Sequence, residues 1–299
     1  MLPATSPTLP PAFPIPSRLP GAVLLCVGVA LLAAPPQGAR AQALEEIAER
    51  DLTGAQFGVG VGVTHMGELG ALEAFGVQAW ESGEPLTPDR VFPFAQFTEV
   101  LVGMTLGALD AGEILDLDAA LSGYLPDVSS DLGSITFRQL LTHTAGLDNA
   151  ELPPGQDWSG ALERLNERAL FTEPGRIYSV SRYSYPLAVW AMETVIGMPF
   201  ADIVQVSILD PLGLTGSTFD LDKARAMGLT PGRTISQDIA SPTIPVEPQA
   251  TRDGLPVFFT TAPDLLTLME TWLDGGVRGS TPQTVMPDEV PGREPGGAV

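Results

Sequence analysis

Two histidines are the first groups to weigh for catalysis or metal binding. His65 and His143 lie far apart in the 299-residue chain. Neither has a serine and an acid spaced around it in a known catalytic pattern, so we expect His143 to tie a helix end to a loop and His65 to be solvated at a hairpin turn. Two separated histidines, with the single cysteine near the N-terminus at Cys26, do not predict a zinc site.

A group of aspartates is the other candidate for metal binding. An EF-type calcium loop needs a central glycine and a terminal glutamate, and this segment has neither in the required place. We therefore expect a solvated acidic face, no metal and no cofactor. The aspartates are Asp116, Asp118, Asp127 and Asp131.

The charge balance excludes one class of partner. The chain has 15 Lys and Arg against 36 Asp and Glu, for a net charge of −21. Such a surface repels phosphate backbones and anionic lipid, so no nucleic acid is expected as a partner. A hydrophobic content of 44% is too high for a disordered chain, and the length allows one large domain or two lobes that share an interface.

Residues 1–41 have the features of an export signal peptide. A basic residue precedes the apolar run from Leu19 to Ala34, and Ala39-Arg40-Ala41 supplies the small residues that a signal peptidase requires. The run is short for a membrane span, so no stable membrane span is expected. Because Cys26 lies in the run, the mature chain would have neither a disulfide nor a thiol nucleophile. The sequence thus predicts a periplasmic or secreted protein.

Alternating residues predict a β-hairpin early in the mature chain. Val59, Val61 and Val63 alternate with glycines, which leave room for close packing on the second face of the strand. Met66-Gly67 offers a turn, after which residues 69–75 can return as the second strand.

Helical periodicity dominates the middle of the chain. Apolar residues from Phe97 onward fall on one predicted helix face, and Gly112 can end this helix. Residues 228–257 have no clear periodicity and predict a long loop, after which Thr261 can cap a helix that runs to about Leu273. The predicted face is formed by Phe97, Val100, Leu101, Met104 and Leu109. The other predicted helices are Phe137–His143, Trp158–Leu170, Leu187–Ile196 and Phe200–Leu209.

Six segments in order and spacing resemble the serine β-lactamase and penicillin-binding-protein superfamily, nearest its class C and esterase-like branch. The resemblance covers about residues 54–276. It implies an α/β (α+β) fold of the β-lactamase/transpeptidase type, with an antiparallel sheet, flanking helices and a helical lobe. The segments are Phe75-Gly76-Val77 with residues 83–89, Leu115–Asp118 with Tyr124-Leu125-Pro126, Ile135–Leu147, Glu173-Pro174-Gly175, Pro211–Leu214 and Phe259–Asp264.

The family's reaction centre is altered at its first element. The resemblance implies a serine that begins a helix and is acylated, with a lysine one turn later that takes the hydroxyl proton. Counting from the flanking segments places Gln96 and Glu99 at these two positions, and an amide has no hydroxyl proton to lose. Thr98 lies about 200° around the helix from Gln96 and is no substitute. The only lysine is Lys223, and Asp220 stands three residues before it, so no Ser-x-x-Lys occurs in any register.

The second and third elements differ too. The family's Tyr-x-Asn positions hold Val180-Ser181-Arg182, and a shift by two recovers only the tyrosine, in Tyr178-Ser179-Val180. Arg182 is a candidate ion-pair partner for Glu99. The Lys-Thr-Gly or His-x-Gly strand is absent, and since the chain stops at Val299 we expect the C-terminal strands of the sheet to be missing.

Three tyrosines flank the region that would line the family's cleft. Tyr178, Tyr183 and Tyr185 are candidate cleft-lining residues, because aromatic rings beside a groove often bind ligands. Packing inside the helical lobe is the alternative for each of them.

These observations predict a signal peptide at 1–41, an incomplete β-lactamase-related domain at 42–276 and a Pro/Gly-rich tail at 277–299. We expect no catalytic residues and an exported, non-catalytic protein, either a cleft-binding pseudoenzyme or a truncated product. The alternative is a serine-type hydrolase acting on peptidoglycan peptides, β-lactams or esters. Expected partners are a cell-wall peptide or small molecule in a vestigial cleft, and a second copy of the chain through the exposed hairpin edge.

Overall fold

The computed structural model describes most of the chain between residues 44 and 273. The predicted signal peptide, the tail and most of the predicted helix Trp158–Leu170 lie outside the described residues. The described residues are 44–47, 58–65, 68–79, 83–125, 127–148, 165–235, 243–246, 251–252 and 254–273.

The predicted hairpin is present. Strands β1 (Val59–His65) and β2 (Glu68–Phe75) pair antiparallel, with a register shift after Val63. Within the described residues β2 is the only strand paired with β1.

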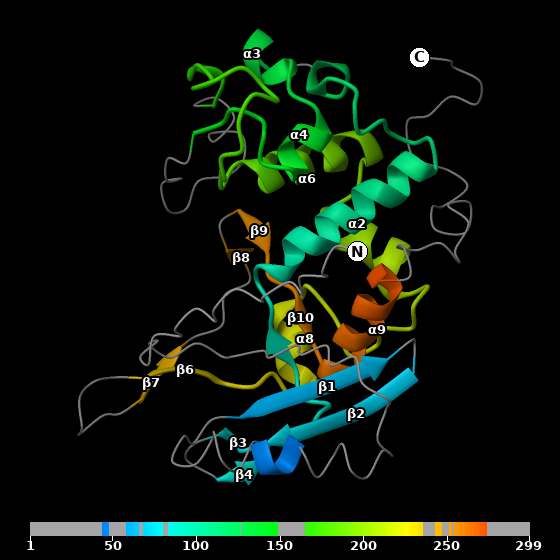
Figure 1. The fold of residues 1–299 in the computed structure, drawn as a ribbon, viewed down its shortest axis with the longest axis vertical. Coiled ribbons are helices and arrows are strands. Elements are labelled where there is room, and N and C mark those ends of the chain that lie inside the picture. Colours follow the sequence, from blue (N-terminus) through cyan, green and yellow to red (C-terminus); the bar gives the residue numbers. More distant parts are fainter. Residues whose placement is uncertain are drawn as a thin grey trace, which may run out of the picture.

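Helix α9 (Ala262–Leu273), predicted to begin after Thr261, lies along β1 (Figure 1). The glycines of β1 permit this approach. A Cβ atom added at Gly62 would come within 2.8 Å of Leu266 Cγ, whereas one at Gly60 would lie 3.8 Å from Ala262 Cβ. The glycine face of the hairpin is thus the face against which a helix packs, as the alternation predicted.

The predicted long loop over residues 228–257 is wrong in part, since four short strands lie there. Each strand has only two to four residues, which is too few to show an alternating pattern in the sequence. The short pairs are β3 (Val77–Ala79) with β4 (Glu84–Pro85), β5 (Phe92–Pro93) with β10 (Phe259–Thr260), β6 (Gly232–Ile235) with β7 (Thr243–Val246), and β8 (Thr251–Arg252) with β9 (Leu255–Pro256).

Helix α2 (Phe97–Ala111) ends at Gly112, as predicted, and its buried face overlaps the predicted one, with Leu101 and Leu109 buried and Phe97 and Met104 packed against the core. Val100 is 37% exposed, whereas Thr98 and Thr105 are fully buried. Polar residues are left out of an apolar pattern, so the sequence pattern missed the two buried threonines and wrongly included Val100. The buried residues are Thr98, Leu101, Val102, Thr105, Leu106 and Leu109.

Most of the remaining helices form the helical lobe, in which α6 and α7 pack on α2, whereas α8 lies beside β10 (Figure 1). Three of them, α4, α6 and α7 with η2, were predicted, whereas η1, α3 and α8 were not. The remaining helices are η1 (Leu121–Gly123), α3 (Ser130–Gly133), α4 (Phe137–Leu141), α6 (Ser184–Ile196), α7 (Phe200–Val204) with its π-helical continuation η2 (Gln205–Leu209), and α8 (Leu221–Ala226).

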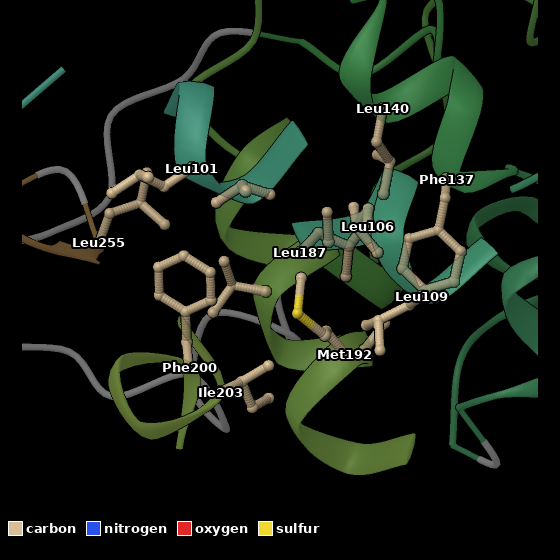
Figure 2. Close-up of a cluster of buried hydrophobic side chains, with 14 of the residues drawn as sticks. Leu101, Leu106, Leu109, Phe137, Leu140, Leu187, Met192, Phe200, Ile203 and Leu255 are labelled. Atoms are coloured by element: carbon tan, nitrogen blue, oxygen red, sulfur yellow. The ribbon is translucent and has the colours of Figure 1, made fainter. Parts of the chain in front are cut away.

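One apolar core joins the helices of the helical lobe. Figure 2 shows Leu106 of α2, Phe137 of α4 and Met192 of α6 meeting in it, with Phe200 and Leu255 at its edge. Helix α8 packs through Ala224 into a second, smaller cluster with Val91, Val257 and Phe259. In the part of the chain that the structure describes, no single helix is long and apolar enough to cross a membrane. Helices α6 and α7–η2 reach that length and hydrophobicity only when taken together, and they are bent by 77° at the break between them.

The close packing of α9 on β1 predicts unequal effects of two alanine substitutions. Gly62→Ala should lower the free energy of unfolding by about 1–3 kcal/mol, because the new methyl group displaces Leu266. Gly60→Ala is the matched control and should be neutral or slightly stabilising, because its methyl group meets only an ordinary contact. Urea unfolding with equal midpoints for the two variants would contradict this packing.

Candidate functional site

The first turn of α2 carries the residues at the predicted nucleophile and base positions. β5, which pairs with β10, leads the chain into this turn. Gln96 is the N-cap residue, and its side chain is exposed and makes no capping hydrogen bond. Glu99 is half-buried, and its backbone N–H donates to the Gln96 carbonyl at 3.2 Å. Neither side chain offers a hydroxyl group.

Thr98 supplies the only hydroxyl group of this turn, and it has a structural partner. Its side chain is fully buried, and its Oγ1 donates to the Pro256 carbonyl at 2.9 Å. The hydroxyl therefore ties α2 to β9 and is directed into the protein. This arrangement agrees with the helical phase, which separates Thr98 from Gln96.

The segment before α6 carries the second set of predicted positions. It runs beside residues 143–146, with Gly175 N–H donating to the Thr144 carbonyl at 2.7 Å and Ser179 N–H to the His143 carbonyl at 2.8 Å. Val180 is 49% exposed, and Arg182 is exposed as well. The backbone route is thus defined by hydrogen bonds, while these two side chains are not part of the core.

Ser181, between them, is a structural residue. It is buried, its Oγ donates to the Asp148 carbonyl at 2.7 Å, and it accepts from the Tyr183 N–H at 3.2 Å. These bonds hold the turn that leads into α6.

The three candidate tyrosines have different environments. Tyr178 is 70% exposed and Tyr185 is half-buried, so both have surface beside the site. Tyr183 is 3% exposed and belongs to the core, so its prediction as a cleft-lining residue is wrong. Tyr183 is the N-cap residue of α6, and its ring packs in the core of the helical lobe.

His143 lies between the two accessible tyrosines. Its ring centroid is 6.0 Å from that of Tyr178 and 5.4 Å from that of Tyr185, and both pairs meet edge to face. The residue has a left-handed backbone with φ of 54°, after the end of α4. Its backbone carbonyl, rather than its ring, makes the expected connection to the loop. Among the described residues, no hydrogen-bond partner is found for the buried Nδ1.

The electrostatics connect these rings to α2. Burial raises the pKa of the Tyr185 hydroxyl, and the nearby Glu99 and Tyr178 raise it further. The Tyr185 hydroxyl donates to the Leu141 carbonyl at 3.2 Å. Burial lowers the pKa of the His143 ring, so this ring is neutral at pH 7. Nothing in the sequence pattern indicated that Glu99 and Tyr185 interact, because they are far apart along the chain.

Two of the aspartates discussed above, Asp116 and Asp118, act as structural acceptors through their side chains. Asp116 Oδ1 accepts from the Asp118 N–H at 2.8 Å, and Asp118 forms a bidentate pair with Arg138 at 2.6 and 2.8 Å. The hydrogen bonds from Arg138 lower the pKa of Asp118. Across the described segments, no three His, Cys, Asp or Glu side chains are grouped so as to hold a metal ion.

Comparison with known proteins identifies the family. The Beta-lactamase family profile matches residues 42–295, and the chain therefore belongs to the Beta-lactamase family. This confirms the resemblance and the fold class that the sequence predicted.

Two curated relatives are enzymes. The chain is similar to Esterase EstB of Burkholderia gladioli, with 29% identity over 58% of this chain and 49% of the relative. It is also similar to the teichoic acid D-alanine hydrolase of Staphylococcus aureus strain MRSA252, with 23% identity over 59% of this chain and 44% of the relative. The chain spans about half the length of these curated relatives.

Solved structures agree on the fold. A class C β-lactamase from Rhodobacter sphaeroides matches with a TM-score of 0.65 and 27% identity, covering 83% of this chain and 69% of that chain. The D-alanine carboxypeptidase AmpC from Burkholderia cenocepacia matches with a TM-score of 0.65 and 22% identity, covering 77% of this chain and 64% of that chain.

The environment of His143 predicts its titration. Since burial lowers its pKa, NMR titration of the ring should give a value below the ordinary one of about 6.5. The unfolded chain then binds the proton more readily, so the stability linked to this neutral ring is present above about pH 6.5 and is lost as the pH falls. His65→Gln assigns the two ring signals. A pKa at or above 6.5 for the remaining signal would contradict the burial of this ring.

Proposed function

We propose that this chain is a non-catalytic, ligand-binding member of the Beta-lactamase family. The observation that carries the proposal is the first turn of α2, where Gln96 and Glu99 stand at the positions that the family uses for nucleophile and base. The fold supports the proposal because it keeps this turn and the segment before α6 in place. Export is part of the proposal and rests on the apolar run from Leu19 to Ala34.

Acyl transfer requires a nucleophile and a group that removes its proton. The amide nitrogen of Gln96 has its lone pair delocalised into the carbonyl, and the carboxylate of Glu99 has no adjacent hydroxyl group to deprotonate. Loss of the nucleophile alone in a comparable hydroxyl-based site lowers turnover by roughly a million-fold. Replacement of both groups therefore leaves the expected rate near the uncatalysed one.

Two other hydroxyl groups near the site, those of Thr98 and Tyr185, are already engaged in the fold. Thr98 is buried and donates to the Pro256 carbonyl. The Tyr185 hydroxyl donates to the Leu141 carbonyl, and its raised pKa keeps it protonated at neutral pH. Each proton already has an acceptor in the fold.

A second candidate function is hydrolysis of an ester, a β-lactam or a peptidoglycan peptide. The similarity to Esterase EstB and to the teichoic acid D-alanine hydrolase favours this alternative. It would require a reacting group other than the residues at positions 96 and 99.

A turnover assay separates the two functions. The wild-type chain should hydrolyse nitrocefin and p-nitrophenyl butyrate no faster than buffer does. The double variant Gln96→Ser with Glu99→Lys restores both side-chain types, but it should recover little activity because Val180 and Arg182 still occupy the second-motif positions.

Circular dichroism of both proteins is the folding control for this assay. A saturable wild-type rate above buffer would contradict the proposal and favour the hydrolase. If that rate disappeared in Thr98→Val, the reacting group would be the buried threonine.

A further inference from the structure

His143 lies where the end of α4, the segment before α6 and α6 itself meet. Its ring contacts Tyr178 of that segment and Tyr185 of α6. We propose that this ring is an acid-sensitive contact, which holds residues 175–180 against the chain after α4 while it is neutral and releases them when it binds a proton. This inference goes beyond the proposed function and does not depend on it.

Two backbone hydrogen bonds attach the segment to the chain after α4. Gly175 N–H donates to the Thr144 carbonyl at 2.7 Å, and Ser179 N–H donates to the His143 carbonyl at 2.8 Å. The second bond is adjacent to Tyr178, whose ring contacts the His143 ring. A movement of His143 therefore acts on both the backbone bond and the ring contact at this end of the segment.

The backbone of His143 has a conformation that its contacts must maintain. Its φ of 54° is left-handed, and a residue with a Cβ atom is unfavourable there. The contacts with Tyr178 and Tyr185 stabilise this conformation, and Tyr185 is itself fixed because its hydroxyl donates to the Leu141 carbonyl at 3.2 Å. When the ring leaves, the backbone can return to an ordinary conformation, and the carbonyl then turns away from Ser179.

The surroundings of the ring suit a neutral imidazole better than a charged one. Nδ1 is buried, and among the described residues no hydrogen-bond partner is found for it. A charged ring carries a proton on both nitrogens, so Nδ1 would become a buried donor without an acceptor in this part of the chain. Burial accordingly lowers the pKa of His143. The proton is therefore bound more readily once the ring has moved into water.

The titratable groups around the ring leave burial as the dominant effect. Tyr178 faces it from the segment and Tyr185 from α6, and the raised pKa of Tyr185 keeps that hydroxyl neutral. Glu99 of α2 acts on Tyr185 and favours a positive ring, but burial is what lowers the pKa of the imidazole. The exposed charged groups on the adjoining elements are the ion pairs of Arg138 with Asp118 and of Arg176 with Glu173, and Arg182 before α6.

Hydrogen exchange of the full chain at pH 7.5 and pH 5.5 tests the proposal. After correction for intrinsic exchange rates, the protection of the Gly175 and Ser179 amides should fall by about two- to tenfold at the lower pH. The reason is that the released ring binds a proton with an ordinary pKa of about 6.5, whereas the packed ring has a lower pKa. The Leu187 amide, which donates to the Tyr183 carbonyl at 2.9 Å, is the internal control and should keep its protection.

Variants of the two histidines give the decisive comparison, because histidine is the side chain that ordinarily titrates between these pH values. His143→Asn removes the titrating ring and keeps a residue type that tolerates a left-handed backbone, so the pH dependence at Ser179 should disappear. His65→Gln is the matched control and should retain the pH dependence. Circular dichroism checks that both variants are folded.

The wild type alone also tests the proposal if His143→Asn does not fold. Its loss of Ser179 protection should begin near pH 6.5 and level off where NMR shows the His143 ring to be protonated. Equal protection at the two pH values, a pH dependence that persists in His143→Asn, or one that disappears in His65→Gln would overturn the proposal. An equal loss at Leu187 would also overturn it, since acid would then loosen the helical lobe as a whole.

Discussion

The burial of α2 is the interaction on which the site depends. Leu101, Leu106 and Leu109 of this helix lie in the core shared with α4 and α6, and Thr98 ties its first turn to β9. These contacts involve the inward face alone, whereas Gln96 is exposed and Glu99 is half-buried. The side chains at the family's reacting positions can therefore change while the helix keeps its place. The position of α2 therefore does not depend on the side chains at 96 and 99.

The segment before α6 is likewise held in place by contacts that do not involve the side chains at positions 180 and 182. Hydrogen bonds from Gly175 and Ser179 attach its backbone to residues 143–146, and Ser181 holds the turn into the helix. The side chains at 180 and 182 take no part in these bonds. The first turn of α2 and the segment before α6 are thus each anchored without the side chains at positions 96, 99, 180 and 182.

Periodic segments could be predicted from the sequence, and irregular ones could not. The hairpin of β1 and β2 and the helices α2 and α6 follow repeats long enough to recognise, and α9 was predicted from its N-terminal capping signal. The strands between residues 232 and 256 are too short for such a repeat, and the buried threonines of α2 are polar residues that an apolar pattern ignores. Tyr183 and Tyr185 could not be distinguished, because their directions depend on where α6 begins. The proximity of Glu99 to Tyr185 arises from packing of distant segments, so local pattern does not contain it.

The central claim is that the first turn of α2, with Gln96 and Glu99 in place of a serine and a lysine, cannot form an acyl-enzyme. The most direct measurement is the intact mass of the protein after prolonged incubation with excess penicillin, with a functional class C β-lactamase as the positive control. The account predicts an unchanged mass for this chain and, with rapid quenching, an added penicillin mass for the control. A stable adduct with the mass of the ring-opened penicillin on any residue of this chain would contradict the account, and peptide mapping would then identify the nucleophile.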